Sequence, residues 1–362
     1  MSDYQVLFEG TPAEKDFYEQ LSRLEVEENA DLPGAISLTL PVGVADGELT
    51  WVSDPRLRPY ANIAVVATAP DAKDECIFDG YALSHKVHLP SGTAGATVEA
   101  WGQDATVLMG LTETVKVWSG MTEADVAKQI FSTYGFTSAA ANDKEPGPTL
   151  SEAEHALVQR GSDADFLRRL ARRTGRWFRV TAADKPGLRA GYFAAPDLDA
   201  SPVVTIGVTD PATSAVAVLD FAWDASRPTT VESRQVSRSD NDKAGISAGT
   251  ADSGLTPLDA RTLAAFAGKD RTVILTAAAD TAELPDRSAG LLRESNWFVR
   301  CEGTADVNVL KRVLRVGQIV EVEGCGSLLS GKFLVWSVRH TFTTQAHTMA
   351  FALVSNALGP SA

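Results

Sequence analysis

Apolar and polar residues alternate along the first third of the chain. Between Ile36 and Val42 every second side chain is apolar, which is the pattern of a strand with one buried face. Turn residues, such as Pro33-Gly34 and Asp79-Gly80, separate runs of this kind at spacings that suit antiparallel sheets closing into a barrel or sandwich. The pattern predicts strands at residues 35–42, 63–68, 77–88 and 96–102.

Near residue 119 the period changes from two to about 3.6, which predicts helices. The first helix begins at a Thr122 cap and ends at Gly135. A second helix begins at Ser162, runs through Arg173 and ends at Gly175. Short strands are expected after it, at 177–181 and 191–193. A small helical segment therefore interrupts the β region.

The β pattern returns at about residue 197. Residues 237–259 are poor in bulky apolar side chains and predict a long loop, and a helix is expected between Pro285 and Ser295. The fold class that follows is mainly β (α+β), with antiparallel sheets that close into a barrel or sandwich and a small helical insert. Strands are predicted at 203–208, 215–223, 230–236, 273–276, 297–303, 319–323, 331–342 and 349–355.

Composition adds limits on the class of protein. The 362 residues are 44% hydrophobic and 22% charged, as in an ordinary globular protein of two or three domains. No run approaches the length of a membrane helix, and no signal peptide is expected at the N-terminus. Cys76, Cys301 and Cys325 are odd in number and lack metal-site spacing, so we expect reduced thiols.

Charge leaves two pairs of interpretations open. A formal charge of −14 disfavours nonspecific binding of nucleic acid. It fits either an acidic wall past which DNA or acidic cargo slides, or plain solubility. The second helix carries an arginine cluster that could bind a phosphate or a partner, or could form a solvated face with ion pairs. The cluster consists of Arg168, Arg169, Arg172 and Arg173.

One motif raises the possibility of a hydrolase. Residues 245–249 match the G-x-S-x-G pattern, in which Ser247 would be the nucleophile. The pattern works on a strained turn between a strand and a helix, and loop-like sequence flanks it here. His340 lies on a predicted strand whose alternation explains it. A hydrolase using Ser247 is therefore a remote alternative, and the chain is expected not to be an enzyme.

No metal or cofactor site is predicted. Asp240 and Asp242 begin a weak calcium-loop match that lacks the final glutamate, because position 251 is alanine. His85 and His88 point to opposite faces of a strand. An acid pair, Glu152 and Glu154, is explained by a helix N-terminal turn better than by glycoside hydrolysis. Catalytic, cofactor-binding and metal residues are accordingly expected to be absent.

A second binding role comes from residues 115–136. This segment weakly resembles a LysM module, but Gly120-Met121-Thr122 lacks the aspartate of that motif. A peptidoglycan-binding tail module is the alternative function, and the other interpretation is a folded helical insert.

Several segments, in order, carry a resemblance that covers nearly the whole chain. These segments are Leu24 to Glu28, Phe78-Asp79-Gly80-Tyr81, Gly120-Met121-Thr122, Ser162 to Ala171, Leu314 to Gln318, Gly331 to Val335 and Val338-Arg339-His340. With them, the chain resembles the phage late control protein D family, which comprises tail hub proteins and the N-terminal part of VgrG spike proteins.

The resemblance implies two β-barrel domains similar to the tail tube subunit. The expected domains are a first barrel (1–118), a helical α+β insert (119–196), strands returning to the first barrel (197–236) and a second barrel with one helix (237–362). The edges of the strands around Ile36 to Leu40 and Gly331 to Phe342 are expected to bear on subunit contacts.

The resemblance also implies the partners. A homotrimer would adapt the hexameric tail tube to a threefold spike and line the lumen, in contact with other baseplate proteins. VgrG-like members continue into a spike, whereas this sequence stops soon after Asn356, so a separate spike protein is expected. DNA or cargo would pass through the lumen, with assembly in the bacterial cytoplasm and no membrane insertion. Phages, bacteriocins and injection systems all fit, with contractile or non-contractile tails.

Overall fold

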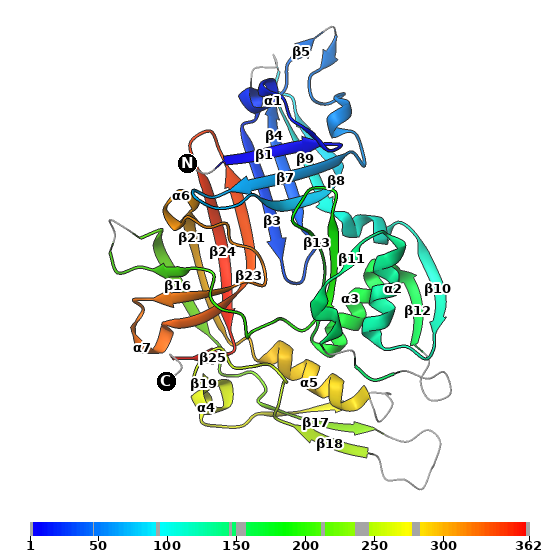
Figure 1. Ribbon diagram of the computed structural model, residues 1–362, viewed down its shortest axis with the longest axis vertical. Coiled ribbons are helices and arrows are strands. Elements are labelled where there is room, and N and C mark those ends of the chain that lie inside the picture. Colours follow the sequence, from blue (N-terminus) through cyan, green and yellow to red (C-terminus); the bar gives the residue numbers. More distant parts are fainter. Residues whose placement is uncertain are drawn as a thin grey trace.

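One long sheet joins the two ends of the chain in the computed structural model (Figure 1). The structure describes residues 3–45, 47–91, 95–144, 147–149, 157–210, 214–235, 246–276 and 283–359, without the side chains of 235 and 246–248. The strand order is β16-β21-β24-β23-β3-β4-β9-β8-β7-β1-β2, and β22 pairs with both β23 and β15. Only the β15–β22 pair of this sheet is parallel.

Four of the N-terminal strands, β4, β7, β8 and β9, coincide with the predicted ones, whereas β1, β2 and β3 were not predicted. The N-terminal strands are β1 (Asp3–Phe8), β2 (Thr11–Pro12), β3 (Arg23–Asn29), β4 (Ala35–Pro41), β7 (Asn62–Thr68), β8 (Glu75–His88) and β9 (Thr97–Asp104). Ile36, Leu38 and Leu40 are at most 1% exposed, so the alternation places a full row of side chains in the core. A short helix, α1 (Lys15–Gln20), buries Phe17 beside them.

The C-terminal strands complete the sheet. They are β15 (Thr205–Gly207), β16 (Val216–Trp223), β21 (Val299–Asp306), β22 (Ile319–Glu323), β23 (Gly331–Phe342) and β24 (His347–Ser355). Strand β23 pairs with β3, and Phe342 lies opposite Leu24. The first and last thirds of the chain therefore share one hydrophobic core.

The expectation that residues 197–236 return to the first barrel is wrong. Strand β16 pairs with β21, and β15 pairs with β22, so both join the C-terminal part of the sheet. Phe221 of β16 contacts Phe333 there, at a ring distance of 6.1 Å. The predicted loop at 237–259 is also partly wrong, because residues 246–250 form strand β18.

The helical insert has its own core, as its amphipathic pattern predicts. Helix α2 (Glu123–Thr133) begins at Thr122, whose side chain accepts a hydrogen bond from the N–H of Asp125. Helix α3 (Asp163–Thr174) begins at Ser162 in the same way, and Gly175 ends it in the left-handed conformation. The surrounding strands are β10 (Glu113–Trp118), β11 (Thr137–Ser138), β12 (Leu157–Ser162), β13 (Trp177–Ala182) and β14 (Arg189–Ala194).

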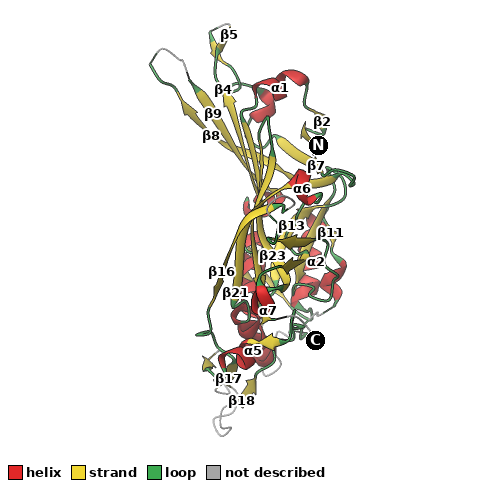
Figure 2. Ribbon diagram, turned by 90° about the vertical axis from the view of Figure 1, so that its left-hand side faces the viewer, coloured by secondary structure: helices red, strands yellow, loops and turns green. Residues whose placement is uncertain are grey.

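The remaining elements lie at the two ends of the molecule. Helix α5 (Glu283–Ser295) contains the predicted helix between Pro285 and Ser295. It packs beside a small sheet of β17, β18 and β20 at one end of the molecule, and the β8–β9 hairpin projects at the other end (Figure 2). The mainly β fold class with large antiparallel sheets is confirmed. The other elements are β5 (Val44–Ala45), β6 (Glu48–Leu49), β17 (Thr230–Gln235), β18 (Ile246–Thr250), β19 (Arg261–Thr262), α4 (Leu263–Ala267), β20 (Thr272–Thr276), α6 (Val307–Leu310), α7 (Gly326–Leu329), β25 (Ala357–Leu358) and the 3-10 turns Pro55–Leu57, Ala105–Gly110 and Ala140–Asp143.

Candidate interaction surfaces

The outer face of the long sheet is polar over most of its width. Directly paired residues share a face of an antiparallel sheet, so strand register identifies its members. One such row crosses seven strands from β21 to β8 and contains hydroxyl, carboxyl and indole groups. The row is Asp306, Thr348, Thr341, Glu25, Ser37, Trp101 and Ser84. This face therefore meets solvent or a hydrated surface.

Acidic groups on this outer face have cationic neighbours. Arg339 contacts Glu27 at 2.9 Å between Nη2 and Oε2, and Arg23 contacts Glu25 at 2.8 Å. Lys86 lies opposite Glu99 in the register of β8 and β9. Exposed pairs of this kind stabilise the fold little, by about 0.2–1 kcal/mol each. Their consequence is local neutrality, which differs from the acidic wall that the net charge allows.

The opposite face of the same strands holds a buried histidine pair. His340 on β23 and His347 on β24 are 0% and 3% exposed, with 3.1 Å between Nδ1 and Nε2. Burial lowers the pKa of His340 well below its usual value, and the neighbouring His347 and Arg315 lower it further. Burial lowers the pKa of His347 to about 4, against an opposing effect of Asp306. Both rings are neutral at neutral pH.

The alternation that explained His340 places it correctly in the sheet, but it gave no sign of its partner. The two histidines are seven residues apart on adjacent strands, and only the hairpin register brings them together. Among described residues, Nε2 of His340 and Nδ1 of His347 have no hydrogen-bond partner.

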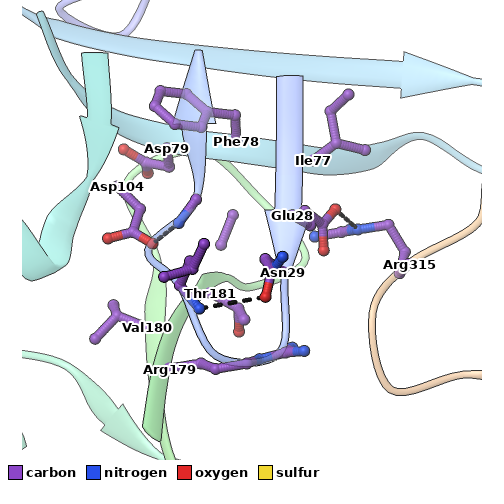
Figure 3. Close-up of a pocket in the computed structure, with 13 residues that line it drawn as sticks. Glu28, Asn29, Ile77, Phe78, Asp79, Asp104, Arg179, Val180, Thr181 and Arg315 are labelled. Carbon is purple, nitrogen blue, oxygen red and sulfur yellow. Dashed lines mark hydrogen bonds and ion pairs between the residues drawn. The ribbon is translucent and has the colours of Figure 1, made fainter. Parts of the chain in front are cut away.

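A small polar cavity lies where the β3–β4 turn meets β8 and β13 (Figure 3). Its volume is about 30 Å³, enough for roughly one water molecule. Asp104 accepts hydrogen bonds there from the N–H of Gly34 at 2.5 Å and of Thr106 at 2.9 Å, and burial raises its pKa. Glu28 forms an ion pair with Arg315. The cavity is too small for a substrate and forms a joint between segments.

Arg179 is the unusual residue of this cavity. Its guanidinium lies 5.6 Å from the Trp177 ring and 5.9 Å from the Tyr192 ring. Its Nε and Nη1 atoms are buried without a hydrogen-bond partner among described residues. Burial lowers the pKa of Arg179, but a guanidinium remains charged in proteins. The nearby carboxylate of Glu28 and the two aromatic faces stabilise this charge.

A buried charge cluster joins the helical insert to α5. Arg176 contacts Asp286 at 3.0 Å, and Arg173 contacts Glu283 at 3.0 Å and also pairs with Glu123. Glu123 is 4% exposed, and burial raises its pKa against the lowering effect of Arg173. The cluster fixes α2, α3 and α5 relative to one another, because each ion is costly to bury without its partner.

The predicted arginine cluster therefore divides. Arg173 belongs to the buried network, and Arg168 contacts Asp165 at 3.3 Å. Arg169 and Arg172 are exposed, and Nη2 of Arg169 donates a hydrogen bond to the Arg160 carbonyl oxygen at 2.6 Å. The interpretation as ion pairs holds for Arg173 and Arg168, and binding of a phosphate or a partner by the exposed Arg169 and Arg172 stays a prediction.

The catalytic and metal candidates do not assemble into a site. Ser247 lies within strand β18, opposite Arg234 of β17, and not on a turn between a strand and a helix. Gly245, Asp240 and Asp242 lie outside the described residues, as do Glu152 and Glu154. His88 is exposed and His85 half-buried on β8. In the described ranges there is no cluster of three metal-ligating side chains.

Three further expectations have structural outcomes. Strands β4 and β23 have neighbours on both sides, so their edges are not free for subunit contacts, contrary to the prediction. The cysteines are free thiols, with Cys76 and Cys301 buried and Cys325 half-buried. None of the described helices has the length and apolar character required to span a membrane.

Comparisons with known proteins agree with this architecture. The family model described as the Alg8 N-terminal domain matches residues 2–344. No curated protein matches the chain. Among solved structures, a tail protein from Neisseria meningitidis MC58 is 15% identical, with a TM-score of 0.68 and coverage of 98% of this chain and 96% of that chain. These findings place the chain among tail-protein folds.

Two more solved structures extend the comparison. The 43 kDa tail protein of prophage MuSo2 from Shewanella oneidensis is 13% identical, with a TM-score of 0.65 and coverage of 99% and 100%. An E. coli component of the type VI secretion system is 13% identical, with a TM-score of 0.54 and coverage of 95% of this chain and 76% of that chain. At these identities the likeness establishes the fold.

Proposed function

We propose that this chain, which belongs to the Alg8 N-terminal domain family, is a structural hub subunit of a phage tail or a phage-derived injection machine. In this role it resembles the late control protein D hubs and the N-terminal part of VgrG. It forms a homotrimeric ring between the tail tube and a separate spike protein, within a virion baseplate or injection particle. In this role the protein assembles with its partners and lets DNA or cargo pass through the ring, and it catalyses no reaction.

The single observation that carries the proposal is the continuous sheet with two different faces. The inner row of His340, Val26 and Ile36 is at most 1% exposed, whereas the outer row holds Thr341, Glu25 and other polar groups. A polymer passes through a lumen without adhering only if the lumen wall is hydrated and locally neutral and has no apolar pocket. The outer face has these properties over most of its width, and we assign it to the lumen.

The domain division follows from the same sheet. Two tube-like units, one N-terminal and one C-terminal, would place six units in a trimeric ring and match the sixfold tube to the threefold spike. Residues 197–223 belong to the C-terminal unit, because β15 and β16 pair with its strands. The helical insert lies to the side of the sheet in Figure 1, away from the proposed lumen.

The oligomeric state is the first test. Light scattering of the purified protein, alone and with the tube and spike proteins, should give a trimer, or a monomer that becomes a trimer on the spike. A monomer that binds neither partner contradicts the hub assignment. Binding to purified cell walls would then test the peptidoglycan alternative.

The lumen assignment has its own test, with cysteines placed on each side of the wall. In a background with Cys325 replaced by serine, Ala350→Cys lies on the outer face and Val309→Cys at an exposed position of helix α6. In the assembled ring, residue 350 should react with a small maleimide but not with a large polyethylene glycol maleimide. Residue 309 should react with both. Equal reaction at residue 350 would place this face outside the lumen.

A further inference from the structure

The two-stranded sheet of β10 and β12 leaves one strand edge open beside helix α3. In the described part of the chain, no other strand pairs with β12. Arg169 donates to the Arg160 carbonyl oxygen from the α3 side. Because the N–H and C=O of one strand residue point to the same side, the backbone of Arg160, and that of Val158 two residues earlier, face away from β10. The carbonyl oxygen of Arg160 has a second lone pair beside the one that Arg169 uses, so an edge of this kind can still accept a further strand.

A groove of about 370 Å³ follows this open edge. One wall comes from α3, where Phe166 and Leu170 are one turn apart and only 2% and 3% exposed. The other wall comes from the start of β12, where Leu157 is buried and Val158 is 38% exposed. The floor is therefore apolar, and it suits the side chains on one face of an extended peptide.

The rim of the groove is cationic. Arg160 and Arg169 are exposed, and neither forms an ion pair with a described residue. Arg173 also lines the groove, but its charge is engaged by Glu123 and Glu283. In a chain with a formal charge of −14, two unneutralised guanidinium groups beside an apolar floor mark a local departure from the overall charge. Their complement is a segment with carboxylates.

We propose that this groove receives an extended acidic segment of a partner protein, which adds to β12 as a third strand. Alternate apolar side chains of the segment contact Phe166 and Leu170, and its carboxylates pair with Arg160 and Arg169. The partner contact lies on the helical insert, away from the long sheet. The inference is therefore independent of the hub proposal, and the isolated chain suffices to test it.

The probe is a short fluorescein-labelled peptide in which glutamate alternates with leucine. Fluorescence anisotropy measures its affinity for the full chain, beside a peptide with lysine in place of glutamate and one with N-methyl groups on alternate amides. The acidic peptide should bind, and the lysine peptide should not. The N-methylated peptide should also lose binding, because it cannot pair with a strand edge. The proposal is overturned if the acidic peptide does not bind, or if either of the other two peptides binds as tightly as the acidic peptide.

Two charge-matched variants locate the site. R160E/R169E should weaken the acidic peptide at least about tenfold and abolish the salt dependence of binding. R58E/R234E changes the net charge equally at exposed positions outside the groove, with side chains 67% and 65% exposed, and should bind as the wild type does. Thermal unfolding checks that both variants fold. Equal affinity in both variants overturns the assignment.

An acidic segment of this same chain is the other candidate occupant of the groove, because Glu152 and Glu154 precede β12 in the sequence. If E152Q/E154Q raises the affinity of the acidic peptide, the groove belongs to the chain's own acidic segment and the partner proposal is overturned. If the variant leaves the affinity unchanged, the site is open to a partner.

Discussion

The two faces of the long sheet are made by the same strands, but they differ in polarity and in exposure to solvent. Thr341, Glu25 and Ser37 form one row of the outer face, and His340, Val26 and Ile36 form the next row on the core face. The core row is at most 1% exposed, so its side chains are fixed by packing. The outer row is constrained by pairing and hydration alone. Stability therefore depends on the core face, and the outer face is available for function.

The largest difference in stability between the faces is expected when two neighbouring residues, one on each face, are truncated to alanine. Phe342 is 1% exposed, and its ring lies 3.9 Å from His347 and 4.6 Å from Tyr4. Phe342→Ala should destabilise the fold by about 3–5 kcal/mol through the cavity that it leaves. Thr341→Ala, one residue away on the outer face, should change stability by less than about 0.5 kcal/mol. Denaturant unfolding measures both, and similar losses would contradict the division.

Removal of a buried ion pair should lower the stability of the fold almost as much. Arg176→Met removes the cation from the joint between α3 and α5 and leaves Asp286 and Glu123 without it. We expect a loss of about 3 kcal/mol, because removing one partner leaves the buried carboxylates with less compensating charge, although Arg173 still pairs with Glu123. A charge-free variant, R176M/D286L, should recover part of this loss. If the double variant is less stable than R176M, the charge of Asp286 is not the cause.

The histidine pair should make the core face sensitive to acid. The unfolded chain binds protons near pH 6.5, but in the folded state the pKa of His347 is about 4 and that of His340 lies well below 6.5. The unfolded state binds more protons in this window, so stability falls as the pH decreases from about 6.5 toward 4. His347→Gln should flatten the pH dependence of the free energy of unfolding there.

A matched control for this effect is His88→Gln, because His88 is exposed on β8. Its unfolding should keep the pH dependence of the wild type. The carboxyl groups of Asp104 and Glu123 have raised pKa values, which favour the folded state at low pH and oppose the histidines. They are present in all variants, so they cancel in the comparison. An unchanged slope in H347Q would rule out the pair as the source.

The smallest effect belongs to the exposed pair on the outer face. Arg339→Met removes the contact with Glu27, in which both side chains are partly exposed, at 54% and 37%. The expected loss is about 0.5 kcal/mol, and it should diminish further in high salt. Chemical unfolding at two salt concentrations checks it. A loss comparable to that of R176M would mean that the two faces do not differ as described.

Much of the fold was predictable because its signals are local. The alternation around Ile36 gave strand β4, and the caps at Thr122 and Ser162 gave the starts of α2 and α3. The site was less predictable. The arginine cluster was recognised, but Arg160 was missed, because the sequence from Leu157 to Ser162 has two adjacent apolar residues and then polar ones, and the alternation of strand β12 appears only in its burial.

The sequence by itself indicated many of the strands and helices, such as β4, α2 and α3, and which side of each is apolar. These properties depend on residues a few positions apart. Only the tertiary structure decided that β3 pairs with β23, that β15 and β16 join the C-terminal strands, and that β4 has no free edge. Pairing across some 300 residues leaves no local trace, because many registers satisfy the same alternation and packing of the whole core selects one.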